Sequence, residues 1–191
     1  MAQNLKNHIA KFVAISDKEF EDIFYFFKSA NFKKKQNLVE AGEISRCHFF
    51  VLSGCLRKYF VNVNGVEQTT EFAIENWWIT DNMAFEHQAK TDFYIQAVEN
   101  SQVLFISAND QERLLQQYPK MERYFRFIYQ RAYAAAQLRF RYLYEFSKEE
   151  FYLHLTKNHP EFVQRIPQYL IASFLGFTPE YLSEIRSKKR S

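Results

Sequence analysis

The hydrophobic pattern changes its period twice along the chain. Residues 3–30 have a helical period, and Ser16 with Glu19 forms a capping box before an apolar run. Residues 32–106 instead consist of short alternating runs rich in Val, Ile, Phe, Tyr and Thr, separated by Gly, Asn and Asp. Such runs are typical of an all-β barrel or sandwich. From Asn109 onward the period is helical again, so the pattern predicts helices, a β domain and further helices in that order.

The β segment is expected to contain several strands that end at turn residues. Asn64 and Gly65 favour a type I′ hairpin between two of them. A polar and aromatic stretch, residues 77–92, interrupts the later strands and predicts a pocket loop or a short helix held on the β scaffold. The expected strands are residues 37–39, 48–52, 56–61, 66–72, 94–98 and 103–106.

The aromatic and polar residues around this stretch are the candidate effector pocket. Aromatic walls with acidic or amide groups suit a neutral or cationic small molecule better than a phosphate. The alternative is that the aromatic side chains fill the β domain and no ligand binds. The expected walls are Phe72, Trp77, Trp78, Phe85 and Tyr94, and the expected polar groups are Asp81, Asn82 and Glu86.

The longest predicted helix covers residues 120–146, which contain neither Gly nor Pro and would span about 40 Å at roughly 1.5 Å per residue. Its apolar spacing of three and four, with alanines at 134–136, favours pairing with a second copy in a homodimer. The alternative is that the helix lies along its own domain. Ser147 and Glu150 form a second capping box, where the last domain begins. The expected dimer residues are Met121, Phe125, Ile128, Ala132, Ala135, Arg139 and Tyr142.

The last part of the chain, residues 167–188, predicts two short helices joined at Gly176. Thr178 is placed to cap the second helix, with Pro179 at its first position. This pattern is typical of a helix-turn-helix, whose second helix enters a DNA major groove, and the alternative is an ordinary helical hairpin. The expected domains are residues 1–118, 119–146 and 147–191. The candidate DNA contacts are Thr178, Glu180, Tyr181, Ser183, Arg186, Ser187, Lys188, Lys189 and Arg190.

Composition narrows the class of protein. With 191 residues, 47% apolar and 18% aromatic, the chain is long and apolar enough to bury a core. The net charge of +3 neither requires nor excludes nucleic acid. Cys47 and Cys55 lack zinc-site and CxxC spacing, so we expect small core residues in a reducing compartment rather than redox sensors. No signal peptide and no run of about 18 apolar residues is found, so we expect a cytoplasmic protein without a membrane segment.

Catalytic motifs are not found in the sequence. A nucleophile elbow, a P-loop, HExxH and GxGxxG are all missing. Glu86 and His87 are neighbours in one loop, which does not establish an acid–base pair. We therefore expect a protein that is not an enzyme and that has no catalytic residue and no metal site.

The order of a helix, a β-roll, a long helix and a helix-turn-helix resembles the Crp/Fnr family of bacterial transcription regulators, in the short form found in Bacteroidetes. Gly42, with Glu43 after it, and Gly54 match turns of the family's cyclic nucleotide-binding domain. Ala172 and Gly176 match close-packing positions of its helix-turn-helix. The resemblance implies an α+β fold with a jelly-roll (double-stranded β-helix) domain, a dimerisation helix and a helix-turn-helix. It also implies a homodimer on double-stranded DNA, with RNA polymerase and a small effector as further partners.

The effector site departs from the family pattern. Members that bind cyclic AMP carry a Gly-Glu pair for the ribose and an Arg for the phosphate, whereas no arginine occurs here between Arg57 and Arg113. Lys90 is the one lysine of residues 77–97, so a buried phosphodiester would lack its bidentate cation. We therefore expect no cyclic AMP and no cofactor, since the four thiolates of an iron–sulfur cluster are also missing. Haem ligation by His48 or His87 is an open alternative to a satisfied polar histidine.

The DNA-reading end departs as well. Pro179 and Glu184 stand where better-known relatives have base-reading arginines. Glu180 matches the family's acidic base reader and would accept a hydrogen bond from cytosine N4. The β-hairpin wing that follows the recognition helix in the family is missing, so we expect a helix-turn-helix without a full wing. A ligand-sensing or scaffold dimer that acts through protein partners is therefore the alternative to a DNA-binding regulator.

Overall fold

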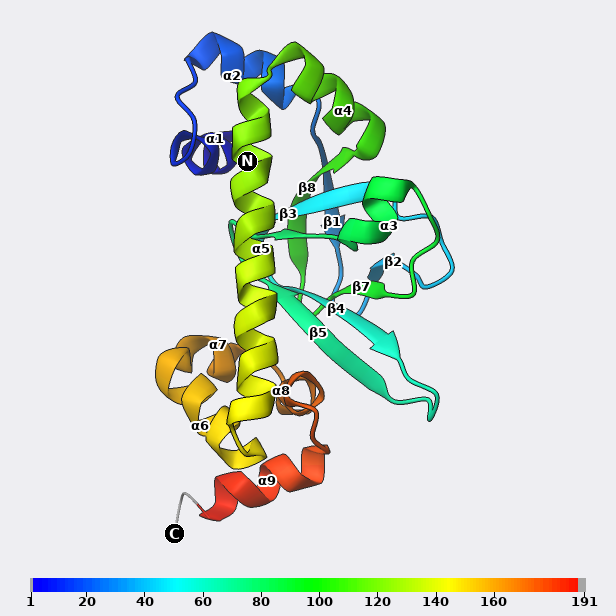
Figure 1. Ribbon diagram of the computed structural model, residues 1–191, viewed down its shortest axis with the longest axis vertical. Helices are drawn as coiled ribbons and strands as arrows, with labels where there is room; N and C mark the ends of the chain where they lie inside the picture. The colour runs from blue at the N-terminus through cyan, green and yellow to red at the C-terminus, as the bar shows by residue number, and fades with distance from the viewer. Residues whose placement is uncertain (1, 189–191) are drawn as a thin grey trace. The chain divides into compact units, whose positions relative to one another are not determined.

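The computed structural model describes residues 2–188 of the chain. The predicted DNA contacts Lys189 and Arg190 lie outside the described residues. The fold is α+β, as the sequence predicts, with helices at both ends of an antiparallel β segment (Figure 1). Among the described helices, none combines the length and the hydropathy that crossing a membrane requires.

The chain divides into two compact units that do not follow the order of the sequence. The first unit runs to Phe60 and resumes with Glu71–Arg131. The second unit combines Val61–Thr70 with the residues from Ala132 onward. A hairpin from the middle of the β segment therefore belongs with the C-terminal helices.

The β-roll consists of two four-stranded antiparallel sheets (Figure 1). One sheet has the strand order β1-β8-β3-β6 and the other has the order β2-β7-β4-β5. Alternate side chains of the strands fill the interior of the roll, among them Val51, Leu56, Ile95 and Val103. The strands are β1 (Lys28–Phe32), β2 (Asn37–Val39), β3 (Cys47–Ser53), β4 (Leu56–Val61), β5 (Glu67–Ala73), β6 (Trp78–Ile79), β7 (Tyr94–Ala97) and β8 (Ser101–Ser107).

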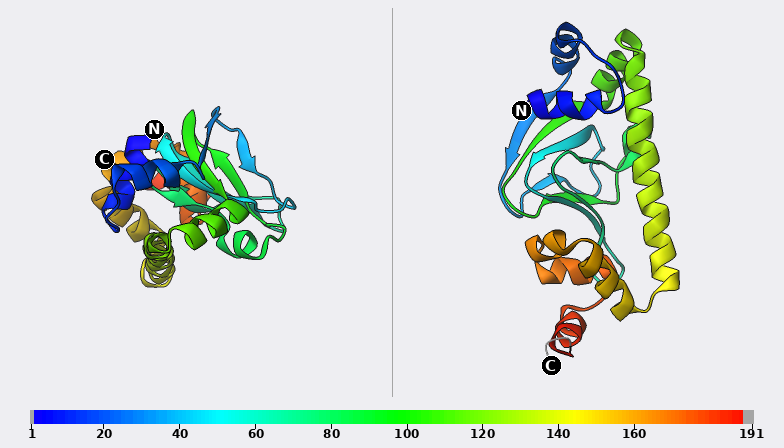
Figure 2. Two further views of the ribbon diagram at one scale, coloured as in Figure 1. Left: turned by 90° about the horizontal axis from the view of Figure 1, so that it is seen from above. Right: turned by 90° about the vertical axis from the view of Figure 1, so that its left-hand side faces the viewer.

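A second core lies where helices cover the outer face of the β1-β8-β3-β6 sheet (Figure 2). Strand β3 serves both cores, since Phe49 and Val51 face the roll interior while Phe50 and Leu52 face the helices. The predicted capping box is confirmed at the start of α2, where the Ser16 amide donates to Glu19. The covering helices are α1 (Ala2–Ala10), α2 (Asp17–Phe24), α4 (Ala108–Gln117) and the first half of α5 (Lys120–Glu145).

The second unit contains the rest of α5 and the C-terminal helices. The second capping box is also confirmed, because Ser147 and Glu150 exchange hydrogen bonds at the start of α6. Apolar residues of both α8 and α9 are buried. The helices are α6 (Lys148–Asn158), α7 (Pro160–Arg165), α8 (Gln168–Leu175) and α9 (Pro179–Lys188).

Two local predictions are wrong. Residues 28–30 form the start of β1 rather than helix, because their backbone groups pair with β8, where Lys28 faces Phe105. The hairpin turn is not type I′, which needs a positive φ at both central residues. Only Gly65 has a positive φ there, at 76°, and its amide donates to the Asn62 carbonyl at 2.9 Å. The Asn62 carboxamide oxygen accepts hydrogen bonds from the amides of Asn64 and Val66 and so stabilises a longer loop.

Candidate functional site

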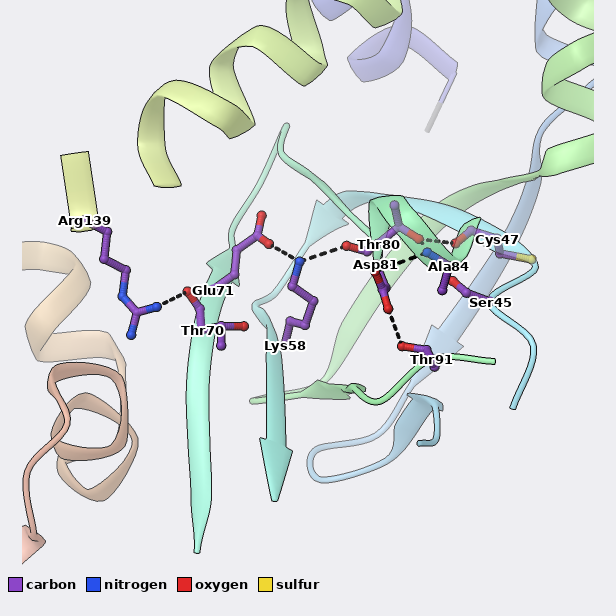
Figure 3. A network of polar contacts seen from close by, with 10 residues as sticks. All are labelled: Ser45, Cys47, Lys58, Thr70, Glu71, Thr80, Asp81, Ala84, Thr91 and Arg139. Atoms are coloured by element: carbon purple, nitrogen blue, oxygen red, sulfur yellow. Dashed lines mark hydrogen bonds and ion pairs between the residues drawn. The ribbon is translucent and has the colours of Figure 1, made fainter. Parts of the chain in front are cut away.

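The predicted pocket segment folds around Asp81, which begins the short helix α3 (Asn82–His87) (Figure 3). Asp81 Oδ1 accepts the Ala84 amide at 3.4 Å and Oδ2 accepts the Thr91 hydroxyl at 2.6 Å. The positive end of a helix favours an anion, and here a carboxylate of the chain itself occupies it. A phosphate at this end of α3 would meet a negative charge.

An ion pair inside the roll supplies the cation that sequence reasoning missed (Figure 3). Lys58 Nζ lies 2.7 Å from Glu71 Oε2 and donates to the Thr80 carbonyl at 3.0 Å. Both side chains are largely sheltered, with 13% of Lys58 and 32% of Glu71 exposed. The period-two pattern places Lys58 on the same face of β4 as Leu56, which was the signal for an interior position.

The predicted pocket residues take part in several different clusters. Trp78 turns into the helix-facing core, where its Nε1 donates to the Tyr124 hydroxyl at 2.8 Å. Tyr94 stacks on Tyr59 at 5.0 Å and faces away from the roll interior, because its neighbours Ile95 and Ala97 face inward. Phe72 and Phe85 are buried, while Trp77, Asn82 and Glu86 are exposed. The prediction that Trp78 and Tyr94 line one common pocket is therefore wrong, because the two side chains pack in different places.

A buried hydrogen-bonded chain joins α1, α5 and β6. The Trp78 indole donates to the Tyr124 oxygen at 2.8 Å, and the Tyr124 hydroxyl lies 2.8 Å from His8 Nδ1, to which it donates when the imidazole proton is on Nε2. His8 must be neutral to accept that bond. Burial first, then the charges of Lys11 and Arg131, lowers the pKa of His8 to about 4. Burial also raises the pKa of Tyr124 far above its usual range.

His48, one of the two histidines considered for haem, is enclosed by aromatic rings. Its ring centre lies 4.5 Å from that of Trp78 and 5.9 Å from that of Tyr129. Complete burial lowers the pKa of His48 to about 3. A side chain enclosed in this way is a core residue without room for a macrocycle beside it, while His87 is exposed at the end of α3.

The helix-turn-helix prediction agrees with the local geometry of α8 and α9. Gly176 has a φ of 75° and ends α8, a conformation that favours glycine. Thr178 Oγ1 accepts the Tyr181 amide at 3.3 Å, and Pro179 is the first residue of α9. Leu182 and Ile185 are buried. The opposite side of α9 is therefore open to a partner.

The exposed side of α9 carries most of the predicted DNA contacts. Arg186 is half-buried, whereas the other described candidates are exposed. Lys148, at the start of α6, adds a cation that the sequence reasoning missed. Its Nζ lies 5.8 Å from the centre of the Tyr181 ring, and it comes from a helix that precedes the motif. The exposed residues of this surface are Thr178, Glu180, Tyr181, Ser183, Glu184, Ser187 and Lys188, together with Lys148.

The predicted dimer face of α5 is largely used within the chain. Met121, Phe125 and Ile128 belong to the helix-facing core and are at most 8% exposed. Arg139 donates to backbone carbonyls, and the Tyr142 ring stacks on the Phe146 ring with 5.3 Å between their centres. Met121, Phe125 and Ile128 are therefore wrong as dimer residues, because the apolar period that marks a helix face does not say whether that face meets its own chain. Arg139 and Tyr142 are half-buried, so their place at a dimer interface stays a prediction. Ala132 is half-buried and Ala135 is exposed on that side.

A different face of α5 is apolar and exposed. Its residues follow the spacing of three and four that a helix pair uses. Tyr133 is 66% exposed and Phe140 is 62% exposed. We call this surface the α5 stripe, and it consists of Tyr133, Ala136, Phe140, Leu143 and Tyr144.

Comparisons with known proteins agree with this architecture. Residues 29–118 match the cyclic nucleotide-binding domain family. CLP, a c-di-GMP responsive global regulator of Xanthomonas campestris, has a TM-score of 0.75 at 13% identity, covering 92% of each chain. FixK2 from Bradyrhizobium japonicum has a TM-score of 0.71 at 15% identity, covering 85% of this chain and 83% of that one. The Catabolite Activator Protein of Thermus thermophilus has a TM-score of 0.58 at 16% identity, covering 92% and 84%.

No curated protein sequence matches the chain. The solved structures are too distant in sequence to show more than the fold, but they extend over both the roll and the C-terminal helices. Residues 29–118 are therefore similar to a cyclic nucleotide-binding domain, and the chain has the same overall fold as CLP and FixK2.

Proposed function

We propose that this protein is a homodimeric DNA-binding transcription regulator of the Crp/Fnr type. The observation that carries the proposal is the capped helix α9, whose apolar side is buried and whose polar side is exposed. A helix held in this way by a preceding helix presents its first turns to base edges in a major groove. The global regulator CLP has the same fold, which supports the proposal.

Within this proposal the exposed residues have different roles. Glu180 and Tyr181 stand in the first turn of α9, where side chains reach base edges. Lys148, which lies near the Tyr181 ring, and Lys188, at the end of α9, are exposed cations and contact phosphates. The tail residues Lys189 and Arg190 are proposed to add further phosphate contacts.

The α5 stripe is the proposed dimer seam. Tyr133 and Phe140 would meet their copies, while Ala136 permits close approach of the two helices. A two-fold pair of α9 helices would then read two half-sites about one DNA turn apart, roughly 34 Å. The proposed partner of this exposed apolar surface is a second copy of the chain.

The β-roll is proposed to respond to a small effector that is not a cyclic nucleotide. The support is the internal charge balance, because Asp81 occupies the end of α3 and Glu71 neutralises Lys58. A neutral or cationic molecule fits these surroundings better than a phosphodiester.

A second candidate function is a scaffold dimer that acts through protein partners. The observation that favours it is that two carboxylates, Glu180 and Glu184, are exposed on α9. Two carboxylates on a recognition helix repel phosphates unless a base donates to them.

Binding of fluorescent duplexes from the DNA upstream of the coding sequence separates these functions. Neutralising Lys188, Lys189 and Arg190 should weaken binding to all sequences alike and lower the salt slope by roughly one per lost phosphate contact. Lys148→Ala should act in the same way, whereas Lys157→Ala, an exposed cation at the end of α6, serves as the matched control. Glu180→Ala should change the preferred bases. Absence of salt-dependent binding to any duplex would rule out the DNA-binding function.

A further inference from the structure

Arg139 joins the β4–β5 hairpin to the helix-turn-helix within the second unit. Its guanidinium donates to the carbonyls of Thr70 at 3.0 Å, Thr69 at 3.1 Å and Phe174 at 2.8 Å. It also lies 4.5 Å from the centre of the Phe174 ring. A planar guanidinium can hold carbonyls of two segments and stack on a ring at the same time, which lysine cannot do. Strand β5 and helix α8 are therefore fixed to one side chain of α5.

Ser173 of α8 makes a second attachment to the same strand. The Thr69 amide donates to Ser173 Oγ at 2.9 Å, and the Ser173 hydroxyl donates to the Glu67 carbonyl at 2.8 Å. The hydroxyl therefore acts as both acceptor and donor toward backbone groups of β5. Arg139 of α5 and Ser173 of α8 are therefore both hydrogen-bonded to the backbone of β5.

Strand β5 continues directly from this attachment into the roll. Glu71 follows Thr70 in the chain and forms the ion pair with Lys58 (Figure 3). Lys58 in turn donates to the Thr80 carbonyl, next to Asp81. A strand is extended and stiff, so a shift at Glu71 moves the neighbouring carbonyls of Thr69 and Thr70.

We propose that β5 is the regulatory connection of this protein, and that the Lys58–Glu71 pair sets how firmly Arg139 and Ser173 hold α8. Breaking the pair in the roll loosens the attachment of α8 and lowers the affinity of α9 for DNA. The second of these effects rests on the proposed function, whereas the first does not. An effector of the roll would act by strengthening or displacing the Lys58–Glu71 pair.

Hydrogen exchange at the Thr69 amide tests the first effect without DNA. Lys58→Met should speed that exchange by roughly tenfold, together with the amides of α8. Glu71→Gln keeps a hydrogen-bond partner for Lys58 and should give a smaller increase, and it carries the test if Lys58→Met does not fold. Lys6→Met, which removes the ion pair with Asp17 in the roll unit, is the matched control. Wild-type exchange at Thr69 in both Lys58→Met and Glu71→Gln would overturn the proposal.

A double-mutant cycle on DNA affinity tests the second effect. Lys58→Met and Arg139→Gln should each weaken binding by roughly tenfold, and the double variant should lose little more than either single variant. Lys58→Met combined with Lys148→Gln should be additive, because Lys148 contacts none of the β5 attachment. Additivity of Lys58→Met with Arg139→Gln would overturn the connection. If the wild type binds no duplex, the proposed function fails while the exchange experiment still decides the coupling.

Discussion

Charged and aromatic side chains have partners within the chain in the interior of the β-roll unit, whereas on the surface of the C-terminal unit they face the solvent. In the roll unit, Lys58, Asp81 and His8 each have a partner within the chain. In the second unit, α9 and the α5 stripe present aromatic and charged side chains to solvent. Groups satisfied inside the chain contribute to folding and resist a competing ligand, whereas exposed aromatic rows remain for a partner. The difference points to recognition by the C-terminal unit and to internal coupling in the roll.

Replacing one buried and one exposed phenylalanine gives the largest contrast between the two regions. Phe125 is 2% exposed and packs against Trp78 and Tyr124, so Phe125→Ala should lower the free energy of unfolding by about 3–5 kcal/mol. Phe140→Ala should change the stability of the monomer by less than about 0.5 kcal/mol. Urea unfolding at several protein concentrations separates monomer stability from association. Equal losses for the two variants would contradict the assignment of Phe140 to an open surface.

Charges placed in the α5 stripe should break the proposed dimer. Tyr133→Glu with Phe140→Glu would bring like charges together across the seam, and we expect a monomeric mass by light scattering. Ala135→Glu is the matched control, because Ala135 is exposed on the other side of α5, and this variant should remain dimeric. A dimer in the first variant, or dissociation in the second, would show that the sequence-predicted face is the seam after all.

The pH dependence of stability should come from the roll unit. The pKa of His8 is about 4 in the folded protein against 6.5 for the free side chain, so below pH 6.5 the unfolded state binds more protons. Stability is therefore complete above pH 6.5 and falls as the pH drops toward 4, by on the order of 1–3 kcal/mol. His48 acts in the same direction. Thermal unfolding as a function of pH measures this loss, and His8→Gln, which keeps an acceptor for Tyr124, should reduce it. An unchanged profile in His8→Gln would exclude His8 as its source.

Local rules of sequence predicted much of the fold. The capping boxes at Ser16 and Ser147 and the glycine turn at Gly176 depend on neighbours within a few residues, so the sequence contains their whole explanation. Strands with clear alternation, such as β4, were placed at their true bounds. The helix-turn-helix was predicted for the same reason.

Apart from the start of β1 and the turn at Gly65, the errors concern which side of an element is buried and which residue a side chain contacts. Helix α5 is apolar on several sides, so its period could not distinguish Phe125, which meets its own core, from Phe140, which does not. Trp78 is an aromatic residue of the kind that lines pockets, but its indole N–H donates to the Tyr124 hydroxyl on α5. The Lys58–Glu71 pair was within reach, because the predicted hairpin already placed both residues on adjacent strands. Lys90, the one lysine of residues 77–97, lies outside this hairpin.

The smallest expected effect is the response of the roll to cyclic nucleotides. Calorimetric titration of the wild type with cyclic AMP or cyclic GMP should release no heat of binding, because Asp81 fills the end of α3 and Glu71 neutralises Lys58. Combining Asp81→Asn with Glu71→Gln removes both carboxylates and leaves Lys58 inside the roll without the negative charge of Glu71. This variant should bind a cyclic nucleotide more strongly than the wild type, and Lys58→Met added to it should abolish the gain. Micromolar binding by the wild type would mean that the internal charges yield to a phosphate, and the contrast between a closed roll and an open C-terminal unit would then not hold.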